Sequence, residues 1–425
     1  MRRWQATVLG LMVLATSAGA VGPAAAGPDQ KRVVSERPFA WTPHVLDGVV
    51  QAIAVVGDVA VVGGRFSAVQ EAASATPVVR HNLFAFQLRT GRLLSGFTPR
   101  LNQPVRALAP GPDHSVYVGG SFTRVNGATR TGLTRLRLKD GSLWPGFSGG
   151  ISSGWVDNIA WHAPYVYVGG SFPHIGGENR TSAARLDADT GRADSNFALH
   201  LSRPTLGRTI VQSMGLSNDG RMLALDGTFT RAGDDNRYQL ALFDVSGRRP
   251  RLMPWTTDVY QRSACQLLGN ETTYLRGIDF SPDGTYFVVV TTGHLNEPRK
   301  LCDTAERFDV AGDGNHKPVW VNHTGANTLL SVEVTGSAVY VGGHQSWLDN
   351  TWGWKWGGPG AVWRPGIGAL DPETGRALAW NPTHDRGNGV EVIVAYPGGI
   401  LVGSDTVHAG GEYHARLCGF PLPTS

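Results

Sequence analysis

Short apolar runs alternate with polar or glycine-rich turns along almost the whole chain. One recurring run ends in a pair of glycines, as in Val61-Val62-Gly63-Gly64. The pattern, complete or degenerate, returns with its last glycine at Gly64, Gly120, Gly170, Gly227, Gly293, Gly343 and Gly403. Successive copies are 50 to 66 residues apart. The chain therefore contains seven repeats, each long enough to hold several strands.

A second apolar run precedes each glycine pair, and it begins with an apolar, a polar and a small residue, as in Val50-Gln51-Ala52. We place its polar position at Gln51, Arg106, Asp157, Gln212, Arg276, Ser331 and Glu391. The alternation of apolar and polar residues predicts a half-buried strand in every repeat.

Two further signals complete the repeat. An aromatic residue near a proline or asparagine recurs at Trp41, Phe97, Phe147, Phe197, Trp255, Trp320 and Trp380. Before it comes a short run such as Leu133-Thr134-Arg135-Leu136, which ends in the turn Lys139-Asp140-Gly141. Each repeat thus predicts four short strands, and repeated four-stranded units are typical of a β-propeller. We therefore expect an all-β fold, a seven-bladed propeller with four-stranded blades.

The two ends of the repeat region complement each other. The first aromatic, Trp41, precedes any complete repeat, and the last repeat stops after its third run, at Phe420. We expect residues 39–43 to form the outer strand of the last blade, which would close the ring and leave no free sheet edge.

The N-terminus resembles a secretory signal. Arg2 and Arg3 precede a short apolar stretch, and Ala18-Gly19-Ala20 or Ala24-Ala25-Ala26 offers a small-x-small cleavage site. We assign residues 1–26 to the signal and residues 27–425 to a single propeller domain. The apolar stretch is too short to span a membrane and no second one follows, although a retained N-terminal anchor is an alternative.

Composition narrows the function classes. The formal net charge is only +4 and the basic residues are scattered, whereas nucleic-acid binding needs them clustered. We expect no nucleic-acid partner, no cofactor and a monomer. Fifty-six glycines and 25 prolines without a collagen-like period agree with many tight turns.

Three cysteines occur in a chain predicted to be exported. Cys265 and Cys302 fall in two long loops of the fifth repeat, and we expect a disulfide between them. The alternative, a Cys/His metal site, lacks the usual ligand spacing. Cys418 lies in an apolar run and is expected to be a buried thiol.

The repeat resembles a known type. Tyr117-Val118-Gly119-Gly120-Ser121-Phe122, followed by Val125-Asn126-Gly127 and Leu133-Thr134-Arg135-Leu136, is similar to the delta-60 (WD40/YVTN-like) propeller repeat. Asp279-Phe280-Ser281-Pro282-Asp283-Gly284 and Gly410-Gly411-Glu412-Tyr413 resemble stretches of secreted bacterial propellers of unknown function. The resemblance implies the fold and brings no catalytic residues with it, and the fourth and fifth repeats match it poorly.

Loop lengths point to one functional face. The turns between the run that begins as Val50-Gln51-Ala52 and the run that ends in the glycine pair are short. The loops that follow the glycine pairs are long, and long loops on a rigid scaffold commonly carry binding sites. After the glycines, the usual Ser-Phe gives way to His294, His344-Gln345 and Ser404-Asp405 in repeats five to seven. We consider His294, His344, Gln345 and Asp405 a candidate polar pocket. Ordinary hydrogen bonding to loops is the alternative, and we expect no metal.

The sixth repeat has an unusual loop. Trp347, Trp352, Trp354, Trp356 and Trp363 fall within 17 residues and alternate with polar residues. Aromatic faces beside hydrogen-bonding groups suit sugars or cations, so Trp347, Trp352 and Trp354 are candidate ligand contacts. The alternative is a lid that packs its own tryptophans.

The polar position of the second run should ring the mouth of the central channel in all seven blades. Because it includes two cations and two anions, we favour a network of pairs between blades over a ligand-binding ring.

These observations leave three functions open. The favoured one is an extracellular binding or scaffold module for a glycan, peptide or cell-wall component. A secreted lyase or hydrolase that uses the polar pocket is the second, although no Gly-x-Ser-x-Gly or His-Glu-x-x-His motif is present, so we name no catalytic residue. A structural module for protein interaction is the third.

Overall fold

The computed structural model describes residues 27–261, 265, 273–294 and 300–423. Every regular element in these residues is a β-strand. The expected all-β class is therefore confirmed. No helix in the described residues has the length and apolarity that a membrane crossing requires.

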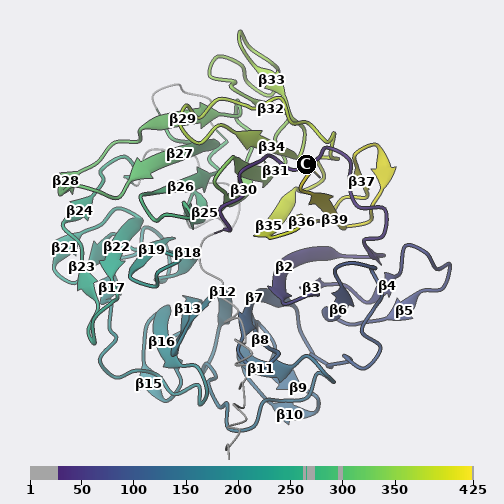
Figure 1. Ribbon diagram of the computed structural model, residues 1–425. Helices are drawn as coiled ribbons and strands as arrows, with labels where there is room; N and C mark the ends of the chain where they lie inside the picture. Colours follow the sequence, from purple (N-terminus) through teal and green to yellow (C-terminus); the bar gives the residue numbers. More distant parts are fainter. Residues whose placement is uncertain (1–26, 262–264, 266–272, 295–299, 424–425) are drawn as a thin grey trace, which may run out of the picture.

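Seven sheets stand around a central channel in the described part of the chain (Figure 1), and we number them 1 to 7 in chain order. Their innermost strands are β2 (Val49–Val56), β7 (Val105–Gly111), β12 (Trp155–His162), β18 (Val211–Leu216), β25 (Leu275–Phe280), β30 (Leu329–Val334) and β35 (Val390–Tyr396). Each innermost strand contacts the next one, and β35 contacts β2.

Each sheet continues outward through antiparallel neighbours. The second strands are β3 (Val59–Arg65), β8 (Ser115–Gly120), β13 (Tyr165–Ser171), β19 (Met222–Gly227), β26 (Tyr286–Thr291), β31 (Val339–Gly343) and β36 (Gly399–Ser404). The third strands are β6 (Leu83–Gln87), β11 (Leu133–Arg137), β16 (Ala183–Asp187), β22 (Leu240–Asp244), β27 (Thr304–Asp309), β34 (Ile367–Leu370) and β39 (Leu417–Pro421).

A fourth strand is formed in two of these sheets, β23 (Arg251–Leu252) in sheet 4 and β29 (Trp320–His323) in sheet 5. In four others the corresponding segment makes a single bridge, such as Phe86 with Leu93. The prediction of four strands in every repeat was therefore wrong for the sheets in which the fourth segment forms no strand. The aromatic residues of this segment, such as Phe97 and Phe197, are nevertheless fully buried and pack on the sheets.

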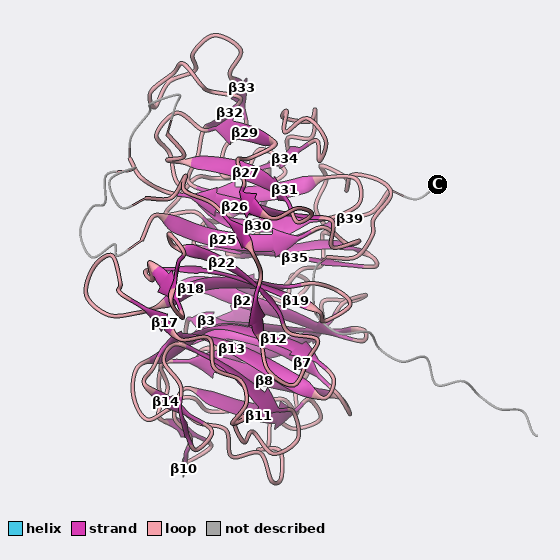
Figure 2. Cartoon of the chain, turned by 90° about the vertical axis from the view of Figure 1, so that its left-hand side faces the viewer, coloured by secondary structure: helices cyan, strands magenta, loops and turns pink. Residues whose placement is uncertain are grey.

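The remaining strands form small hairpins and bridges in the loops (Figure 2). They are β1 (His44–Val45), β4 (Ala68–Gln70), β5 (Val78–Val79), β9 (Arg124–Val125), β10 (Ala128–Thr129), β14 (His174–Ile175), β15 (Glu178–Asn179), β17 (Leu201–Ser202), β20 (Arg231–Ala232), β21 (Asp235–Asn236), β24 (Trp255–Thr256), β28 (Gly314–Asn315), β32 (Trp347–Leu348), β33 (Val362–Trp363), β37 (His408–Ala409) and β38 (Glu412–Tyr413).

The two sequence signatures meet at the contacts between sheets. A Cβ placed on Gly63 of sheet 1 would come within 2.5 Å of Cγ1 of Val105, which starts the innermost strand of sheet 2. The same contact joins Gly119 to Val156 at 2.6 Å. A valine of one sheet thus packs against the bare backbone of its neighbour, which explains why the glycine and the valine recur together.

A β-bulge lies at the same place in every innermost strand. In sheet 1 the pairing skips Gln51, between Val50 and Ala52. In sheet 6 it skips Leu330, between Leu329 and Ser331. The residue equivalent to Gln51 is therefore Leu330. The prediction that Ser331 is the equivalent residue was wrong by one position. The sequence does not reveal this register, because Leu329 and Leu330 are both apolar.

The N-terminal segment lies along the last sheet. Ser35 N donates to Pro421 O and Phe39 N to Gly419 O, both at 2.8 Å. Residues 39–43 themselves form no strand, although Phe39 and Trp41 stack with ring centroids 4.5 Å apart.

The cysteine predictions are confirmed. Cys265 and Cys302 form a disulfide that joins the loop before β25 to the loop between β26 and β27. Cys418 is free and buried in β39, and burial raises the pKa of its thiol.

Candidate binding site

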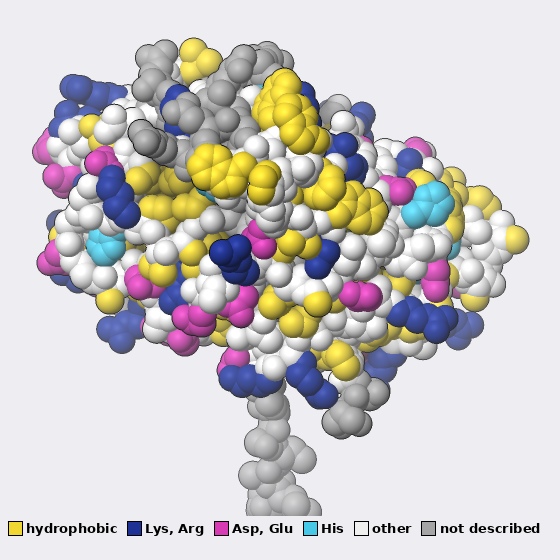
Figure 3. Space-filling view, turned by 90° about the horizontal axis from the view of Figure 1, so that it is seen from above, with side chains coloured by type: hydrophobic (Ala, Val, Ile, Leu, Met, Phe, Trp, Pro, Cys, Tyr) yellow, Lys and Arg dark blue, Asp and Glu magenta, His cyan; other side chains and the backbone are white. Residues whose placement is uncertain are grey.

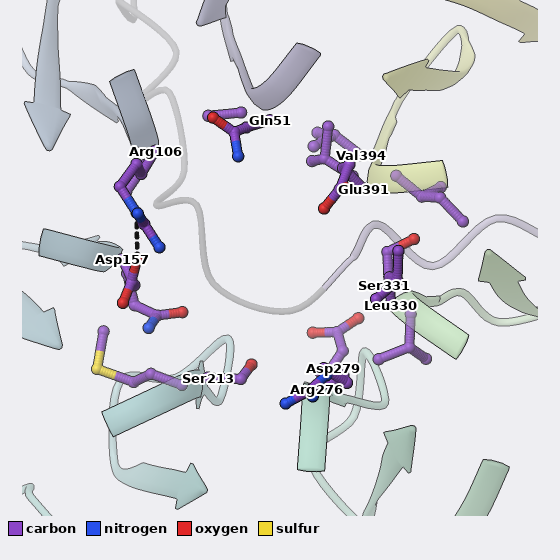
Figure 4. Close-up of a pocket in the computed structure, with 18 of the residues that line it drawn as sticks. Gln51, Arg106, Asp157, Ser213, Arg276, Asp279, Leu330, Ser331, Glu391 and Val394 are labelled. Carbon is purple, nitrogen blue, oxygen red and sulfur yellow. Dashed lines mark hydrogen bonds and ion pairs between the residues drawn. The ribbon is translucent and has the colours of Figure 1, made fainter. Parts of the chain in front are cut away.

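One mouth of the central channel is a cavity of about 520 Å³ lined by all seven innermost strands. Its lining includes the whole predicted set, Gln51, Arg106, Asp157, Gln212, Arg276, Ser331 and Glu391, which we call the channel mouth. Figure 4 shows side chains of this set directed into the cavity from different sheets. The β-bulges redirect six of these side chains into the cavity, whereas Ser331 directly follows the bulged residue Leu330.

Several groups of the channel mouth bond across sheet boundaries. Arg106 Nε of β7 lies 2.6 Å from Asp157 Oδ1 of β12, as the dashed line in Figure 4 marks. The second oxygen of Asp157 accepts Trp155 Nε1 at 2.6 Å. Ser331 Oγ donates to Val390 O of the next sheet at 2.9 Å. The Arg106–Asp157 and Ser331–Val390 bonds connect neighbouring sheets, whereas the Trp155–Asp157 bond lies within β12.

Burial dominates the electrostatics of the channel mouth. It raises the pKa of Glu391 to about 7, with a further contribution from the nearby Asp405 carboxylate. Burial also raises the pKa of Asp157, and the Arg106 guanidinium opposes that shift. Near neutral pH, Glu391 is therefore divided between its charged and neutral forms.

The four residues of the candidate polar pocket have different partners. His344 interacts with the charges of Arg386 and His294, and burial followed by these charges lowers its pKa. The Gln345 side chain is fully buried, and its amide has no hydrogen-bond partner among the described residues. Asp405 lines a hollow with Arg65 and Arg416, and the backbone of Asn388 bonds both Asp405 and His344.

Asp405 stabilises the loop that precedes β35. Its carboxylate accepts the backbone amides of Asn388 at 2.9 Å and Gly389 at 3.1 Å, just before β35 begins. This bonding pattern matches the alternative of ordinary loop hydrogen bonding more closely than that of a shared pocket.

Residues 347–363 form what we call the tryptophan loop, between β31 and β34. Four of its tryptophans are strongly exposed, at 69% for Trp352, 46% for Trp354, 59% for Trp356 and 48% for Trp363. Figure 3 views the molecule from the side that carries β32 and β33 and shows hydrophobic side chains gathered there. The loop therefore presents its tryptophans to solvent and does not pack them beneath a lid.

Asn350 holds the tryptophan loop in shape. Its side chain is fully buried, its Nδ2 donates to Trp356 O at 2.9 Å, and its Oδ1 accepts Gly358 N at 2.9 Å. The Asn350 backbone amide donates to His323 O at the end of β29. One amide thus ties the two sides of the loop together and anchors them on sheet 5.

The remaining members of the loop complete the surface. The rings of Trp354 and Trp356 meet edge to face with centroids 5.7 Å apart. Lys355 Nζ lies 5.3 Å from the Trp354 ring centroid, a cation–π distance. Trp347 is half-buried and packs beneath Gly357. Of the three tryptophans proposed from sequence, Trp352 and Trp354 are therefore accessible, whereas Trp347 supports the loop.

Sequence reasoning missed two kinds of residue. Asn350 was not distinguished from other polar loop residues, because its role depends on contacts within the loop. The carboxyl groups of Asp279 and Glu333 were also missed, although both line the channel. Among the described residues, no group of three or more His, Cys, Asp or Glu side chains is arranged to hold a metal ion.

Comparisons with known proteins identify one matching family model and similar solved structures. A family model described as a domain of unknown function (DUF5122) beta-propeller matches residues 111–147, which span part of sheet 2. No curated protein matches the sequence. Among solved structures, the computationally designed Ika8 protein is similar over 88% of this chain and 96% of its own, with 11% identity and a TM-score of 0.47.

Proposed function

We propose that the chain is an exported, seven-bladed β-propeller of the delta-60 type that binds glycans through its tryptophan loop. The ligand class would be a polysaccharide of the cell wall or its surroundings, and the protein would act as a monomeric binding module without turnover. The exposed tryptophans held by Asn350 are the observation on which this proposal depends.

Blade number and ring closure are supported by three features. Seven sheets surround one channel, and β35 of the last contacts β2 of the first. Gly403 of sheet 7 receives Val50 of sheet 1 in the same way as Gly63 receives Val105. The hydrogen bonds from Ser35 N and Phe39 N to carbonyl groups of β39 support closure of the last sheet by the N-terminal segment.

Export is supported by the signal-like N-terminus and the disulfide. A disulfide such as Cys265–Cys302 persists in oxidising compartments outside the cytosol.

The chemistry of the tryptophan loop favours sugars. Indole faces stack on the apolar C–H faces of pyranose rings, and Trp352, Trp354 and Trp356 are separated along the chain by Gly353 and Lys355. A ready-made loop also avoids the entropic cost of ordering these side chains on binding. Four of the eight strongly exposed large hydrophobic side chains described belong to this loop. Such concentration marks an interaction surface.

A pull-down with insoluble cell-wall polysaccharides tests the proposal. We expect the wild-type protein to bind at least one fraction, and the Trp352→Ala/Trp354→Ala double variant to bind at least about tenfold more weakly. Tyr413→Ala is the matched control, because Tyr413 is an exposed aromatic outside the loop. Equal retention of wild type and double variant, or release of soluble sugar during incubation, would contradict a non-catalytic tryptophan-loop module.

A further inference from the structure

Gly27, the first residue described, is buried at the opposite mouth of the channel. It and Pro28 line a cavity of about 640 Å³ together with Asp279 and Glu333. The segment that follows is fixed to sheet 7, since Gln30 Nε2 donates to Tyr396 O and Gly399 O, each at 2.9 Å. In Figure 1 this N-terminal segment, in purple, runs to the centre of the ring.

Asp279 of β25 and Glu333 of β30 form a pair of carboxyl groups deep in the channel. Asp279 accepts Phe280 N at 2.9 Å and Val334 N at 2.7 Å, and Glu333 accepts Ala395 N at 3.0 Å. Neither forms an ion pair with a basic side chain of the described residues. Enclosure raises the pKa of Asp279 to about 7, and enclosure together with the Asp279 charge raises the pKa of Glu333. The pair therefore has the environment of two anions that lack a counter-charge.

Gly27 lies directly against this pair. A Cβ placed on Gly27 would come within 2.7 Å of Glu333 Oε1 and 2.5 Å of Val334 O. A side chain there would collide with the β30 backbone, so the position requires glycine. The backbone nitrogen of Gly27 is bonded to the same Cα, so it lies in the immediate neighbourhood of the Glu333 carboxyl group.

We propose that the chain is cleaved between Ala26 and Gly27, and that the new α-ammonium group of Gly27 forms a buried ion pair with Glu333 and Asp279. Hydrolysis adds one water across the amide bond, leaving a carboxylate on Ala26 and an amine on Gly27 that takes up a proton. The cleavage supplies a positive charge directly beside the Asp279–Glu333 pair, so processing of the chain and neutralisation of the pair are one event. This goes beyond the glycan-binding proposal and is independent of it.

The sequence supports this position of the cut. Ala24-Ala25-Ala26 offers small residues on the leaving side, and Gly27 is the residue that the channel accommodates. The other small-x-small site, after Ala20, would leave six further residues ahead of Gly27 and no ammonium group beside Glu333.

The first experiment identifies the N-terminus of the exported protein by mass spectrometry. A mature chain that begins at Gly27 is the expected result. A chain that begins at Val21, or at any residue other than Gly27, would overturn the proposal.

The second experiment compares two purified proteins, one that begins at Gly27 with a free amine and one that carries a single additional alanine. We expect the additional alanine to lower the melting temperature by at least about 2 °C at pH 7. The same comparison in a Glu333→Gln/Asp279→Asn background should show no difference. If these variants do not fold, acetylation of the α-amine of the otherwise unchanged protein replaces them, and it should lower the melting temperature similarly. Equal melting temperatures for free, extended and acetylated chains would refute the ion pair.

The pH dependence gives an independent readout. A paired α-ammonium has a pKa above its usual value of about 8, so its stabilisation is lost as the pH rises through the folded-state pKa. The stabilisation also weakens at acidic pH, where Glu333 and Asp279 take up protons. The advantage of the chain that begins at Gly27 should therefore disappear at high pH. An advantage that stays constant up to pH 11 would contradict the proposal.

Discussion

Cγ1 of Val50 lies 2.4 Å from the position that a Cβ on Gly403 would occupy, which brings the first and last sheets into the contact that joins Gly63 to Val105. The two residues are far apart in sequence. Their contact makes the boundary between sheets 7 and 1 as tightly packed as those between neighbours along the chain.

Gly403→Ala should destabilise the protein, because the added methyl group overlaps the Val50 side chain. Overpacking of this kind costs about 1–3 kcal/mol. Urea unfolding followed by circular dichroism measures the loss. Gly247→Ala is the control, since a Cβ there meets nothing closer than 3.5 Å. Equal stability of the two variants would show that the boundary between sheets 7 and 1 accommodates the added methyl group without loss of stability.

Removal of the disulfide should also destabilise the fold. Cys265 and Cys302 are 37 residues apart, and closing a loop of this size restricts the unfolded chain enough to contribute about 2–4 kcal/mol. The Cys265→Ser/Cys302→Ser variant should therefore melt at a lower temperature. Cys418→Ser offers a comparison in which no crosslink is lost, and added reductant should lower its melting temperature as it lowers that of the wild type. A disulfide-free variant that melts with the wild type would exclude a stabilising role.

Asp226 predicts a particular pH dependence. It occupies the glycine position of sheet 4, its carboxyl oxygens are fully buried, and burial raises its pKa to about 7. A carboxyl whose pKa is higher in the folded state binds an extra proton there, so stability falls as the pH rises from about 4 to 7. Asp226→Gly should remove this fall, on the order of 2–4 kcal/mol.

Chemical denaturation at pH 4.5 and 7.5 measures that effect. Asp58→Asn, at an exposed turn, should keep the wild-type pH dependence. Since Glu306 and Glu391 also have raised pKa values, of about 8 and about 7, part of the slope should remain in the Asp226→Gly variant. An unchanged slope in that variant would mean that Asp226 is ionised in the folded protein.

Asn350→Ala tests whether the shape of the tryptophan loop matters for binding. The substitution removes no tryptophan but breaks the hydrogen bonds to Trp356 O and Gly358 N. We expect glycan binding to weaken about tenfold, because the indoles must then be ordered at the moment of binding. Binding isotherms followed by tryptophan fluorescence measure the change. Affinity equal to that of the wild type would mean that the Asn350 hydrogen bonds are not needed to order the loop for binding.

Much of the sheet architecture was predictable, because the glycine–valine contact leaves the same residues at five of the seven boundaries between sheets. The bulge was harder to place in sheet 6. There Leu329 and Leu330 are both apolar, and hydrophobicity does not distinguish the strand residue from the bulged one. The fourth strand was overestimated for a similar reason, since a buried aromatic such as Phe97 looks the same in a strand and in a turn.

The candidate site was predictable in composition but not in geometry. Five closely spaced tryptophans stand out in any sequence, yet their exposure depends on the buried amide of Asn350. The pairing of Asp279 with Glu333 joins residues 54 positions apart, on one innermost strand and the next, and no local pattern marks it. His344 and Asp405 follow equivalent glycines in neighbouring repeats, and the backbone of Asn388, which contacts both, is not marked by any local pattern.

The glycine–valine contact also constrains how such a ring evolves. A repeat that offers a glycine to the next and a valine to the previous one can be duplicated or exchanged without redesign. Sheets 4 and 5 break this rule. Asp226 takes the glycine position in sheet 4, while in sheet 5 Val290 takes it and Gly277 makes room for Val332 of sheet 6. An exchange of repeat five alone would therefore separate Gly277 from the valine that fits against it.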